Sequence, residues 1–327
     1  MPRVAVIIVN SNSGTYLPRA LEALGRQSLA PAVSYLVDNG STDGSADDAE
    51  ARFPWIEVIR LGRNAGFAAA NNIAVRRTDC DLVALLNPDA FPEPEWLERL
   101  VDAAGAAPGH ASFTSRLILA ADESVLDGEG DSYGVNGFAW RRHHGLPVAD
   151  GDASGGEVFS ACAAAALYRR DAFLEAGGFD ERFFTYLEDV DLGFRLRLRS
   201  AGCLYVPESI AHHVGSGVTG RASDFSVYHA QRNLVWTFVK DMPAPLLWLY
   251  LPQHLLLNLA AIAWYSLRGQ ARTILRAKRD AVKGLRAIRA QRREVQSLRT
   301  ARPAALRRGM VKGGRAFAAA LRRASSV

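Results

Sequence analysis

The first hundred residues alternate between short apolar runs and longer amphipathic stretches, and this alternation limits the possible folds more than any other feature. Four runs are strand-like and nearly continuous in apolar side chains: RVAVIIVN, VSYLVDN, IEVIRL and DLVALLN. Each is followed by a stretch with helical spacing, such as YLPRALEALGRQS, in which Leu17, Ala20, Leu21 and Leu24 share one face. Strands and helices in this order predict an α/β fold with a parallel, doubly wound sheet.

Polar loops follow all four of these strands. They read NSNS at 10–13, DNGSTD at 38–43, RNAGF at 63–67 and NPDA at 87–90. Asn, Asp, Gly and Ser are also ordinary turn formers, so a single loop of this kind indicates no more than a turn. Because ligands of parallel α/β sheets bind at the carboxyl ends of the strands, four such loops together predict one binding crevice.

The loops lack the glycine patterns GxGxxG and GxxxxGK[ST], which grip phosphate groups. This argues against a dinucleotide site, a P-loop and a nucleotidyltransferase that relies on a Gly- and Lys-rich loop. The predicted crevice instead offers carboxylates and amides, namely Asp38, Asp43, Asp89, Asn10, Asn12, Asn64 and Asn72. Carboxylates that face a phosphorylated ligand are expected to share a divalent cation with it, and Mg²⁺ or Mn²⁺ suits such oxygen ligands.

Three carboxylates interrupt the apolar segment FFTYLEDVDLGFRLRL at 183–198. Glu188, Asp189 and Asp191 need compensation there, because ionised acids seldom sit in apolar surroundings alone. One interpretation is the acidic first turn of a helix, which the helix dipole favours. The other is the working end of an active site. Asp191 is expected to pair with Arg195, four residues further along.

Six motifs in this order resemble those of family 2 inverting glycosyltransferases, with closest similarity to the bacterial rhamnosyltransferase and galactofuranosyltransferase branch. They are VIIVNSNSGTYLPRALEALGRQS, DNGSTDGS, NAGFAAANN, LNPDA, GGFDERFFTYLEDVDLGFRLR and HHVGSG. The resemblance covers residues 3–220 and implies a GT-A fold within 1–225. Its nucleotide-sugar-binding half would be 1–110, and its acceptor half, which completes a mixed central sheet, would be 111–225.

The resemblance also implies an activity. Family members move a sugar from a nucleotide-sugar donor, here dTDP-rhamnose or a UDP-sugar, to a hydroxyl group with inversion at the anomeric carbon. The implied acceptor is a glycan or a polyprenyl-linked sugar, and the implied process is cell-wall or surface polysaccharide synthesis. A divalent metal ion, Mg²⁺ or Mn²⁺, would assist the transfer.

The resemblance implies donor-side roles for the residues that match the family motifs. Asp38 would contact the base or ribose, beside the backbone of Val9 and Asn10. Asn87 and Asp89 occupy the first and last positions of the family's Asp-x-Asp metal motif; Asn87 departs from that pattern, so Asp89 is expected to be the main carboxylate ligand. The expected nucleotide-sugar site is Val9, Asn10, Asn12, Asp38, Asn64, Gly66, Asn72, Asn87 and Asp89.

On the acceptor side, Asp189 matches the family's general base, which takes the proton of the acceptor hydroxyl. Glu188 is expected to help position the acceptor. His213 matches a histidine that serves family members as a further metal ligand, and it fits better than His212; the alternative for this pair is a structural role. A basic run is interpreted either as part of the acceptor site or as a solvated loop, and it consists of Arg141, Arg142, His143 and His144.

Residues 245–267 are the most apolar stretch and read PLLWLYLPQHLLLNLAAIAWYSL. About 23 residues are nominally enough to span the ~30 Å hydrocarbon core of a bilayer. Polar residues and a proline near the middle disfavour a simple span, namely Pro252, Gln253, His254 and Asn258. An in-plane or re-entrant helix on the inner face of the cell membrane is favoured, with a buried homo-oligomer interface as the alternative. The aromatic side chains expected at the membrane interface are Trp248, Tyr250, Trp264 and Tyr265.

The chain divides into an acidic body and a basic tail. Residues 268–327 contain eighteen Lys or Arg and two acids and so carry +16, which leaves −11 for residues 1–267 out of the net +5. Within the expected helical region 226–327, this tail is interpreted as binding anionic lipid or lipid-linked pyrophosphate acceptors. The alternative function is a nucleic-acid-binding protein that acts through the tail. No nucleic-acid partner is expected, because the tail has few aromatic side chains and no recognised fold.

The cysteines and the amino terminus both point to the cytoplasm. Cys80, Cys162 and Cys203 lie far apart without a CxxC pair, so buried reduced thiols are expected, with neither a disulfide framework nor a zinc knuckle. The first apolar run is too short for a secretory signal.

Overall fold

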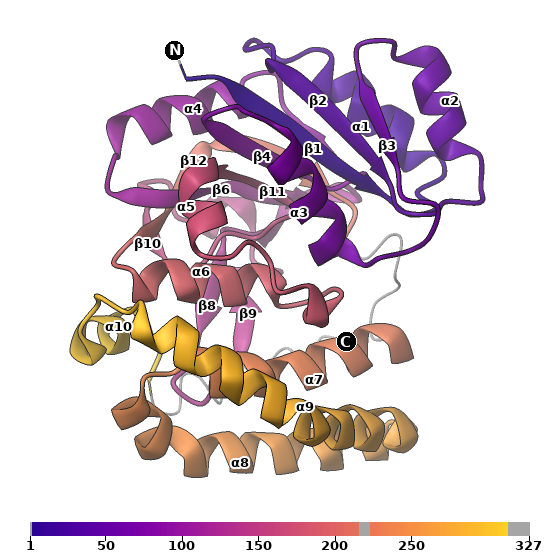
Figure 1. Ribbon diagram of the computed structural model, residues 1–327. Coiled ribbons are helices and arrows are strands. Elements are labelled where there is room, and N and C mark those ends of the chain that lie inside the picture. Colours follow the sequence, from indigo (N-terminus) through magenta and orange to yellow (C-terminus); the bar gives the residue numbers. More distant parts are fainter. Residues whose placement is uncertain (1, 216–222, 313–327) are drawn as a thin grey trace.

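The computed structural model describes residues 2–215 and 223–312 (Figure 1). The last residues of the HHVGSG motif, and 313–327 of the basic tail, therefore lie outside the described residues. The strands are β1 (Val4–Asn10), β2 (Val33–Asp38), β3 (Glu57–Arg60), β4 (Leu82–Leu86), β5 (Ala90–Pro92), β6 (His110–Leu119), β7 (Asp122–Gly128), β8 (Asp131–Tyr133), β9 (Ala139–Arg141), β10 (Gly156–Val158), β11 (Ala165–Arg169) and β12 (Gly202–His213). The helices are α1 (Tyr16–Leu24), α2 (Ser45–Arg52), α3 (Phe67–Arg77), α4 (Trp96–Ala106), α5 (Arg170–Glu175), α6 (Glu188–Leu198), α7 (Asp224–Asp241), α8 (Ala244–Leu267), α9 (Ala271–Ser297) and α10 (Pro303–Gly309), with short 3₁₀ turns at Val148–Asp150 and Glu181–Phe183.

The amino-terminal half is a parallel sheet in the order β3–β2–β1–β4, as its alternating pattern predicts. Every residue of β1 and β4 is buried, because helices cover both faces of these strands. The register places Asn10 opposite Asp38, so the polar loops that follow β1 and β2 leave the sheet side by side.

The second half makes the sheet mixed, as expected for the acceptor half. Strand β11 runs antiparallel to both β4 and β6, whereas the long strand β12 runs parallel to β6. The short strand β5 pairs antiparallel with the end of β12, and this register places His213 directly opposite Ala90. The pairing therefore brings the NPDA loop next to a histidine more than a hundred residues away.

Helix α6 begins at Glu188, and the aromatic residues before it form a tight loop. Phe184, Tyr186 and Leu187 have φ of 66°, 68° and 67°, in the left-handed region that non-glycine residues rarely adopt. Gly66 lies against this loop, and a Cβ there would fall 2.6 Å from a ring carbon of Phe184. The loop and the start of α3 thus fit together only because residue 66 lacks a side chain.

The carboxyl-terminal helices pack beside α6 and the β8–β9 hairpin (Figure 1). One hydrophobic cluster joins Phe194 of α6 to Phe238 of α7, Leu246 of α8 and Leu306 of α10. Helix α9 lies along α7 and buries an apolar stripe of Ile274, Ala277, Ala281 and Ile288. The amino-terminal part of the basic tail is therefore a packed helix, with its charges on the remaining faces.

The apolar segment forms the single continuous helix α8, with Pro252 inside it. No turn interrupts the helix between Ala244 and Leu267. By length and composition alone, α8 is long and apolar enough to cross a membrane. Tyr250 is buried instead of lying at an interface, because it packs in the core and its hydroxyl accepts a hydrogen bond from Arg307 at 2.7 Å. Several apolar side chains of α8 remain exposed, namely Trp248, Leu249, Leu255, Leu256, Leu259 and Leu267.

Candidate functional site

A cleft of about 1020 Å³ opens where the parallel strands end. It lies between the polar loops of the parallel half, the start of α6 and the facing sides of α7 and α8. Eight of the residues expected in the site line this cleft, namely Val9, Asn64, Gly66, Asn87, Asp89, Glu188, Asp189 and His213.

Asp89 and His213 form the metal-type pair of the cleft. Both side chains are buried, and His213 Nε2 lies 3.3 Å from Asp89 Oδ1. Asn87 Nδ2 lies 3.5 Å from the same ring nitrogen. Burial works to lower the pKa of His213, but the carboxylates of Asp127 and Asp89 raise it above its ordinary value. An imidazole nitrogen aimed at a carboxylate oxygen in a buried pocket fits a divalent cation bound between them.

Asp127 holds the other nitrogen of this histidine, and the sequence reasoning did not identify it. The Nδ1 of His213 lies 2.7 Å from Asp127 Oδ2. Metal-binding histidines commonly donate their second N–H to a carboxylate, which fixes the ring orientation. Although burial works to raise the pKa of Asp127, Arg141, His144 and His213 hold it well below its usual range. The signal in the sequence was the acidic run DGEGD at 127–131, directly after an apolar pair.

Arg141 interacts with the groups around both His213 and Asp189. Its guanidinium forms an ion pair with Asp127 and lies 3.4 Å from His213 Nδ1. Its positive charge also acts on the carboxylate of Asp189. Burial alone would lower the pKa of Arg141, but Asp127 raises it above its usual value, so the residue stays charged.

Asp189 lies in the first turn of α6 and is oriented by the backbone. Its Oδ2 accepts the N–H of Ala163 at 3.1 Å, and its Oδ1 accepts the N–H of Val190 at 2.8 Å. Burial raises the pKa of Asp189, while these hydrogen bonds and Arg141 oppose the rise. The carboxylate is thus held in place with a raised basicity.

Burial shifts the pKa of Glu188 further from its ordinary value than that of Asp189. The side chain is buried, and its Oε2 has no hydrogen-bond partner among the described residues. Burial, followed by the charge of Asp189, raises the pKa of Glu188 well above its ordinary value. Burial and mutual repulsion therefore favour the protonated form of Glu188 more strongly than that of Asp189.

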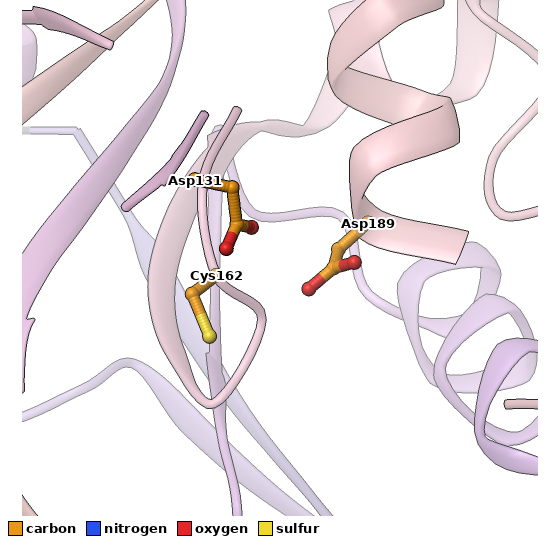
Figure 2. Close-up of side chains that lie close together, drawn as sticks. All are labelled: Asp131, Cys162 and Asp189. Atoms are coloured by element: carbon orange, nitrogen blue, oxygen red, sulfur yellow. The ribbon is translucent and has the colours of Figure 1, made fainter. Parts of the chain in front are cut away.

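Two further side chains face Asp189 across the cleft, as Figure 2 shows. They are Asp131, the first residue of β8, and Cys162; the ligand atoms of all three lie within 4.8 Å of one another. Burial raises the pKa of the Cys162 thiol above its ordinary value. Because the thiol stays protonated and Arg141 already brings a positive charge here, this group is better suited to contact hydroxyl groups than to bind a metal ion.

The loops that follow β2 and β3 are connected by amide hydrogen bonds. Asn39 Nδ2 donates to Asn64 Oδ1 at 3.0 Å, and Asn39 Oδ1 accepts the N–H of Ala65 at 2.7 Å. Asn64 Oδ1 also accepts the N–H of Gly66 at 2.9 Å. Asn39 lines the cleft and was not singled out from the sequence, although it stands next to Asp38 in the DNGSTD loop.

Four residues expected in the nucleotide-sugar site do not line the cleft. The buried amide of Asn10 bonds Ser41 and Ser45, and that of Asn72 bonds Phe179, so these amides hold loops together. Asn12 is exposed and accepts the N–H of Thr42 at 2.8 Å. The buried carboxylate of Asp38 accepts the N–H of Ser41 and lies 3.9 Å from Arg60.

Two residues of the basic run 141–144 lie at the cleft, and the other two lie outside it. Arg141 and His144 line the cleft. Arg142 pairs with Asp152 at 2.6 Å, and His143 lies 2.6 Å from Glu129, outside the cleft lining.

Asp191 is structural, as its expected pair with Arg195 is formed. Arg195 donates to Asp191 Oδ2 through Nε at 2.9 Å and through Nη2 at 2.7 Å. The buried Lys240 of α7 also contacts Asp191 and lies 2.8 Å from Asp180 Oδ2. These ion pairs join α6 to α7 behind the site. The three cysteines are buried and free, as expected for reduced thiols.

Comparison with known proteins gives a consistent assignment. The model of "Glycosyl transferase family 2" matches residues 5–177. The N-acetylglucosaminyl-diphospho-decaprenol L-rhamnosyltransferase of Mycobacterium tuberculosis H37Rv is 31% identical over 275 residues, which cover 74% of this chain and 87% of that protein. The O-antigen biosynthesis protein RfbC of Myxococcus xanthus is 27% identical over 225 residues, covering 65% of this chain and 17% of that protein.

Two solved structures share the fold. GalNAc-T7, solved with UDP, GalNAc and Mn²⁺, superposes with a TM-score of 0.60 at 15% identity over 73% of this chain and 48% of that one. The mannosyltransferase PcManGT from Pyrobaculum calidifontis, solved with GDP-Man and Mn²⁺, superposes with a TM-score of 0.54 at 17% identity over 91% of this chain and 86% of that one. The comparisons give no support to the nucleic-acid-binding alternative.

Proposed function

Because the chain belongs to glycosyl transferase family 2, as its six motifs predict, we propose a specific transfer reaction for this enzyme. It moves a sugar from a nucleotide-sugar donor to a hydroxyl group of a lipid-linked or glycan acceptor, with inversion. The observation that carries the proposal is the shared cleft, in which Asp189 is linked through Arg141 and Asp127 to the pair of His213 and Asp89. One base and one metal-type pair are the two parts that such a transfer needs.

Asp189 is the general base in this proposal. The acceptor oxygen attacks the anomeric carbon, the bond from that carbon to the diphosphate oxygen breaks, and Asp189 takes the hydroxyl proton. Two backbone N–H groups hold the carboxylate in position, and its raised pKa makes it a better proton acceptor. Glu188, whose pKa is raised by burial and by the charge of Asp189, would position the acceptor, and in its protonated form its carboxyl group can donate a hydrogen bond to an acceptor oxygen.

Asp89 and His213 are the proposed ligands of a divalent cation. The donor set fits one, because the His213 ring is already held by Asp127 with Nε2 directed at Asp89. When bound, Mg²⁺ or Mn²⁺ would neutralise the charge that develops on the departing diphosphate. The Mn²⁺ ions in the structures of GalNAc-T7 and PcManGT support the use of a divalent cation.

The donor and acceptor are proposed from the relatives. The mycobacterial relative is an L-rhamnosyltransferase of N-acetylglucosaminyl-diphospho-decaprenol, which makes dTDP-rhamnose the first donor to test and UDP-sugars the second. A diphospho-polyprenol sugar is correspondingly the first acceptor to test. The process supported by these relatives is cell-wall or surface polysaccharide synthesis.

We also propose that the enzyme works on the inner face of the cell membrane. The exposed apolar side chains of α8 supply a surface that hydrocarbon would cover, with Trp248 exposed by 70%. The basic residues of α9 adjoin this helix and would be attracted to anionic headgroups. A homo-oligomer that covers α8 is the alternative, and cosedimentation with anionic vesicles separates the two.

A donor screen followed by a base variant tests the proposal. Purified protein is heated with each of a panel of sugar nucleotides and Mg²⁺ or Mn²⁺, and the true donor raises the melting temperature. Asp189→Asn is expected to lower turnover by about 10²- to 10⁴-fold, the usual contribution of a general base, while donor binding is retained. Asp122→Asn, at an exposed carboxylate that is absent from the cleft lining, is the matched control. Transfer by Asp189→Asn at the rate of the control would refute the assignment of the base.

A further inference from the structure

The cleft continues past the proposed base into an apolar groove between two helices. On α8, Leu257, Ala261 and Trp264 recur at intervals of four and three, so they share one face of the helix, and all three line the cleft. The opposite wall is α7, whose cleft-lining residues include Val227, Ala230 and Leu234 at intervals of three and four. We name these six residues the α7–α8 groove.

Helix α8 is apolar on its outer side as well. Leu255, Leu256 and Leu259 are exposed by 55%, 60% and 64%, whereas Leu257 is exposed by 7%. Figure 1 shows α8 as the outermost element of the helical part, on the side away from the parallel strands. A helix with apolar side chains all round is suited to contact with hydrocarbon on more than one side. Here one side borders the groove and the other has no protein partner among residues 2–215 and 223–312.

Contacts of His254 join α8 to α7 and to the turn between β8 and β9. The ring of His254 stacks on Phe238 with centroids 3.9 Å apart, and its Nδ1 lies 2.8 Å from the backbone oxygen of Asn136. The following residues Phe138 and Trp140 line the cleft. A preformed apolar groove binds a flexible chain without a large ordering cost to the protein.

Polar groups stand beside the apolar walls. Gln231 of α7 and Asn258 of α8 line the same cleft, and so does Arg268 at the end of α8. The guanidinium of Arg268 lies 4.3 Å from the centroid of the Trp264 ring, which orients this cation at the groove. An exposed arginine next to an apolar wall suits a ligand that joins a phosphate group to a hydrocarbon chain.

We propose that the α7–α8 groove holds the first isoprene units of a polyisoprenyl-diphosphate sugar acceptor. The inference rests on the proposed function, since it identifies the acceptor of the same reaction. The continuity of the groove with the cleft lets the sugar reach Asp189 while the hydrocarbon stays out of water. The exposed outer side of α8 places the entrance of the groove where a bilayer would supply the rest of the lipid chain.

Binding of a short isoprenoid tests this directly. Farnesyl diphosphate and inorganic diphosphate are titrated calorimetrically into the full-length protein, without detergent. The wild type is expected to bind farnesyl diphosphate at least tenfold more tightly, because its chain leaves water. Ala261→Trp, which fills the groove at a half-buried position, is expected to abolish this preference and to leave inorganic diphosphate unaffected. Ala230→Leu, on the opposite wall, is expected to reduce the preference in the same way and covers the case that the first variant does not fold.

Ala263→Trp is the matched control, because residue 263 is exposed, lies on the same helix and is absent from the cleft lining. Equal loss of farnesyl diphosphate binding in this control would overturn the proposal. Dodecyl phosphate that binds as tightly as farnesyl diphosphate would also overturn it, because the groove would then accept straight acyl chains.

A separate thermal-shift measurement with sugar nucleotides keeps the two proposals apart. Stabilisation by a sugar nucleotide, without farnesyl diphosphate binding, would overturn the groove assignment alone. Farnesyl diphosphate binding that Ala261→Trp abolishes, in a protein that no sugar nucleotide stabilises, would support the groove and refute the proposed donor chemistry.

Discussion

Lys240→Met is expected to destabilise the protein strongly, because Lys240 compensates two buried carboxylates from different segments. Its side chain is 1% exposed, and its Nζ lies 2.8 Å from Asp180 and contacts Asp191 of α6. Methionine is similarly unbranched and only one atom shorter, so the change removes the charge with little loss of packing. Breaking a buried ion pair from one side typically costs about 3–5 kcal/mol.

The structure places the expected loss near the lower end of that range, at about 3 kcal/mol. Asp191 keeps two hydrogen bonds from Arg195, and Asp180 keeps three from Arg182, the shortest at 2.9 Å. Neither carboxylate is therefore left without a cation when the lysine is replaced.

The loss is also expected to depend on pH. Burial works to raise the pKa of Asp180, but Lys240 and Arg182 hold it below its ordinary value. A carboxyl group whose pKa is lowered by folding adds stability above its unfolded pKa of about 3.9, and this stability is lost as the pH falls through the folded pKa. The difference between wild type and variant should therefore be largest near neutral pH and shrink below about pH 4.

Urea unfolding of wild type and Lys240→Met, followed by circular dichroism at neutral pH and again below about pH 4, measures the difference in unfolding free energy between the two proteins. Lys278→Met is the matched control, because burial lowers the pKa of Lys278 to about 7 and its Nζ donates to two oxygens of Gln231. Its replacement breaks no ion pair within the described part of the chain. A loss for Lys240→Met below about 1 kcal/mol, or one that does not change between neutral and acid pH, would refute the reasoning.

Three further changes probe the cleft. Gly66→Ala should cost about 1–3 kcal/mol in urea unfolding, because its Cβ would lie 2.6 Å from the ring of Phe184 at a φ of 89°; an unchanged unfolding midpoint would contradict this. Asp127→Asn should raise the metal concentration for half-maximal activity by about 10- to 100-fold, because His213 loses its charged partner, and an unchanged metal titration would count against that role. Arg141→Gln should move the acid limb of the pH–rate profile upward, because the proposed base loses a cation that lowers its pKa; a limb that stays or moves downward would exclude this coupling.

Local patterns were sufficient for the parallel half of the fold. The burial of β1 and β4 and the helices between the strands follow from short-range periodicity, which each segment carries within itself. The same holds for the loops after β1, β2 and β4, whose positions at the strand ends are set by chain order. The motifs in these loops also predicted the family, which the comparisons confirm.

The tertiary structure decided which of these polar residues face the cleft. Asn72 and Asn64 are equally polar in the sequence, yet Asn72 bonds the backbone of Phe179, whereas Asn64 lines the cleft. Such a difference depends on contacts between segments about a hundred residues apart, which periodicity does not report. The partnership of Asp127 with His213 was missed for the same reason.

For the carboxyl-terminal region, the amino-acid sequence by itself determined that residues 245–267 are apolar and that a basic helical segment follows. It also determined that Glu188, Asp189 and Asp191 share one helical turn. Only the packing of α6 against α7 assigned Asp191 to an ion-pair network and left Asp189 open to the cleft. Only the placement of α7 opposite α8 made the apolar segment into the wall of a groove. Hydrophobicity follows from composition, whereas a binding surface depends on which side of the helix other elements leave uncovered.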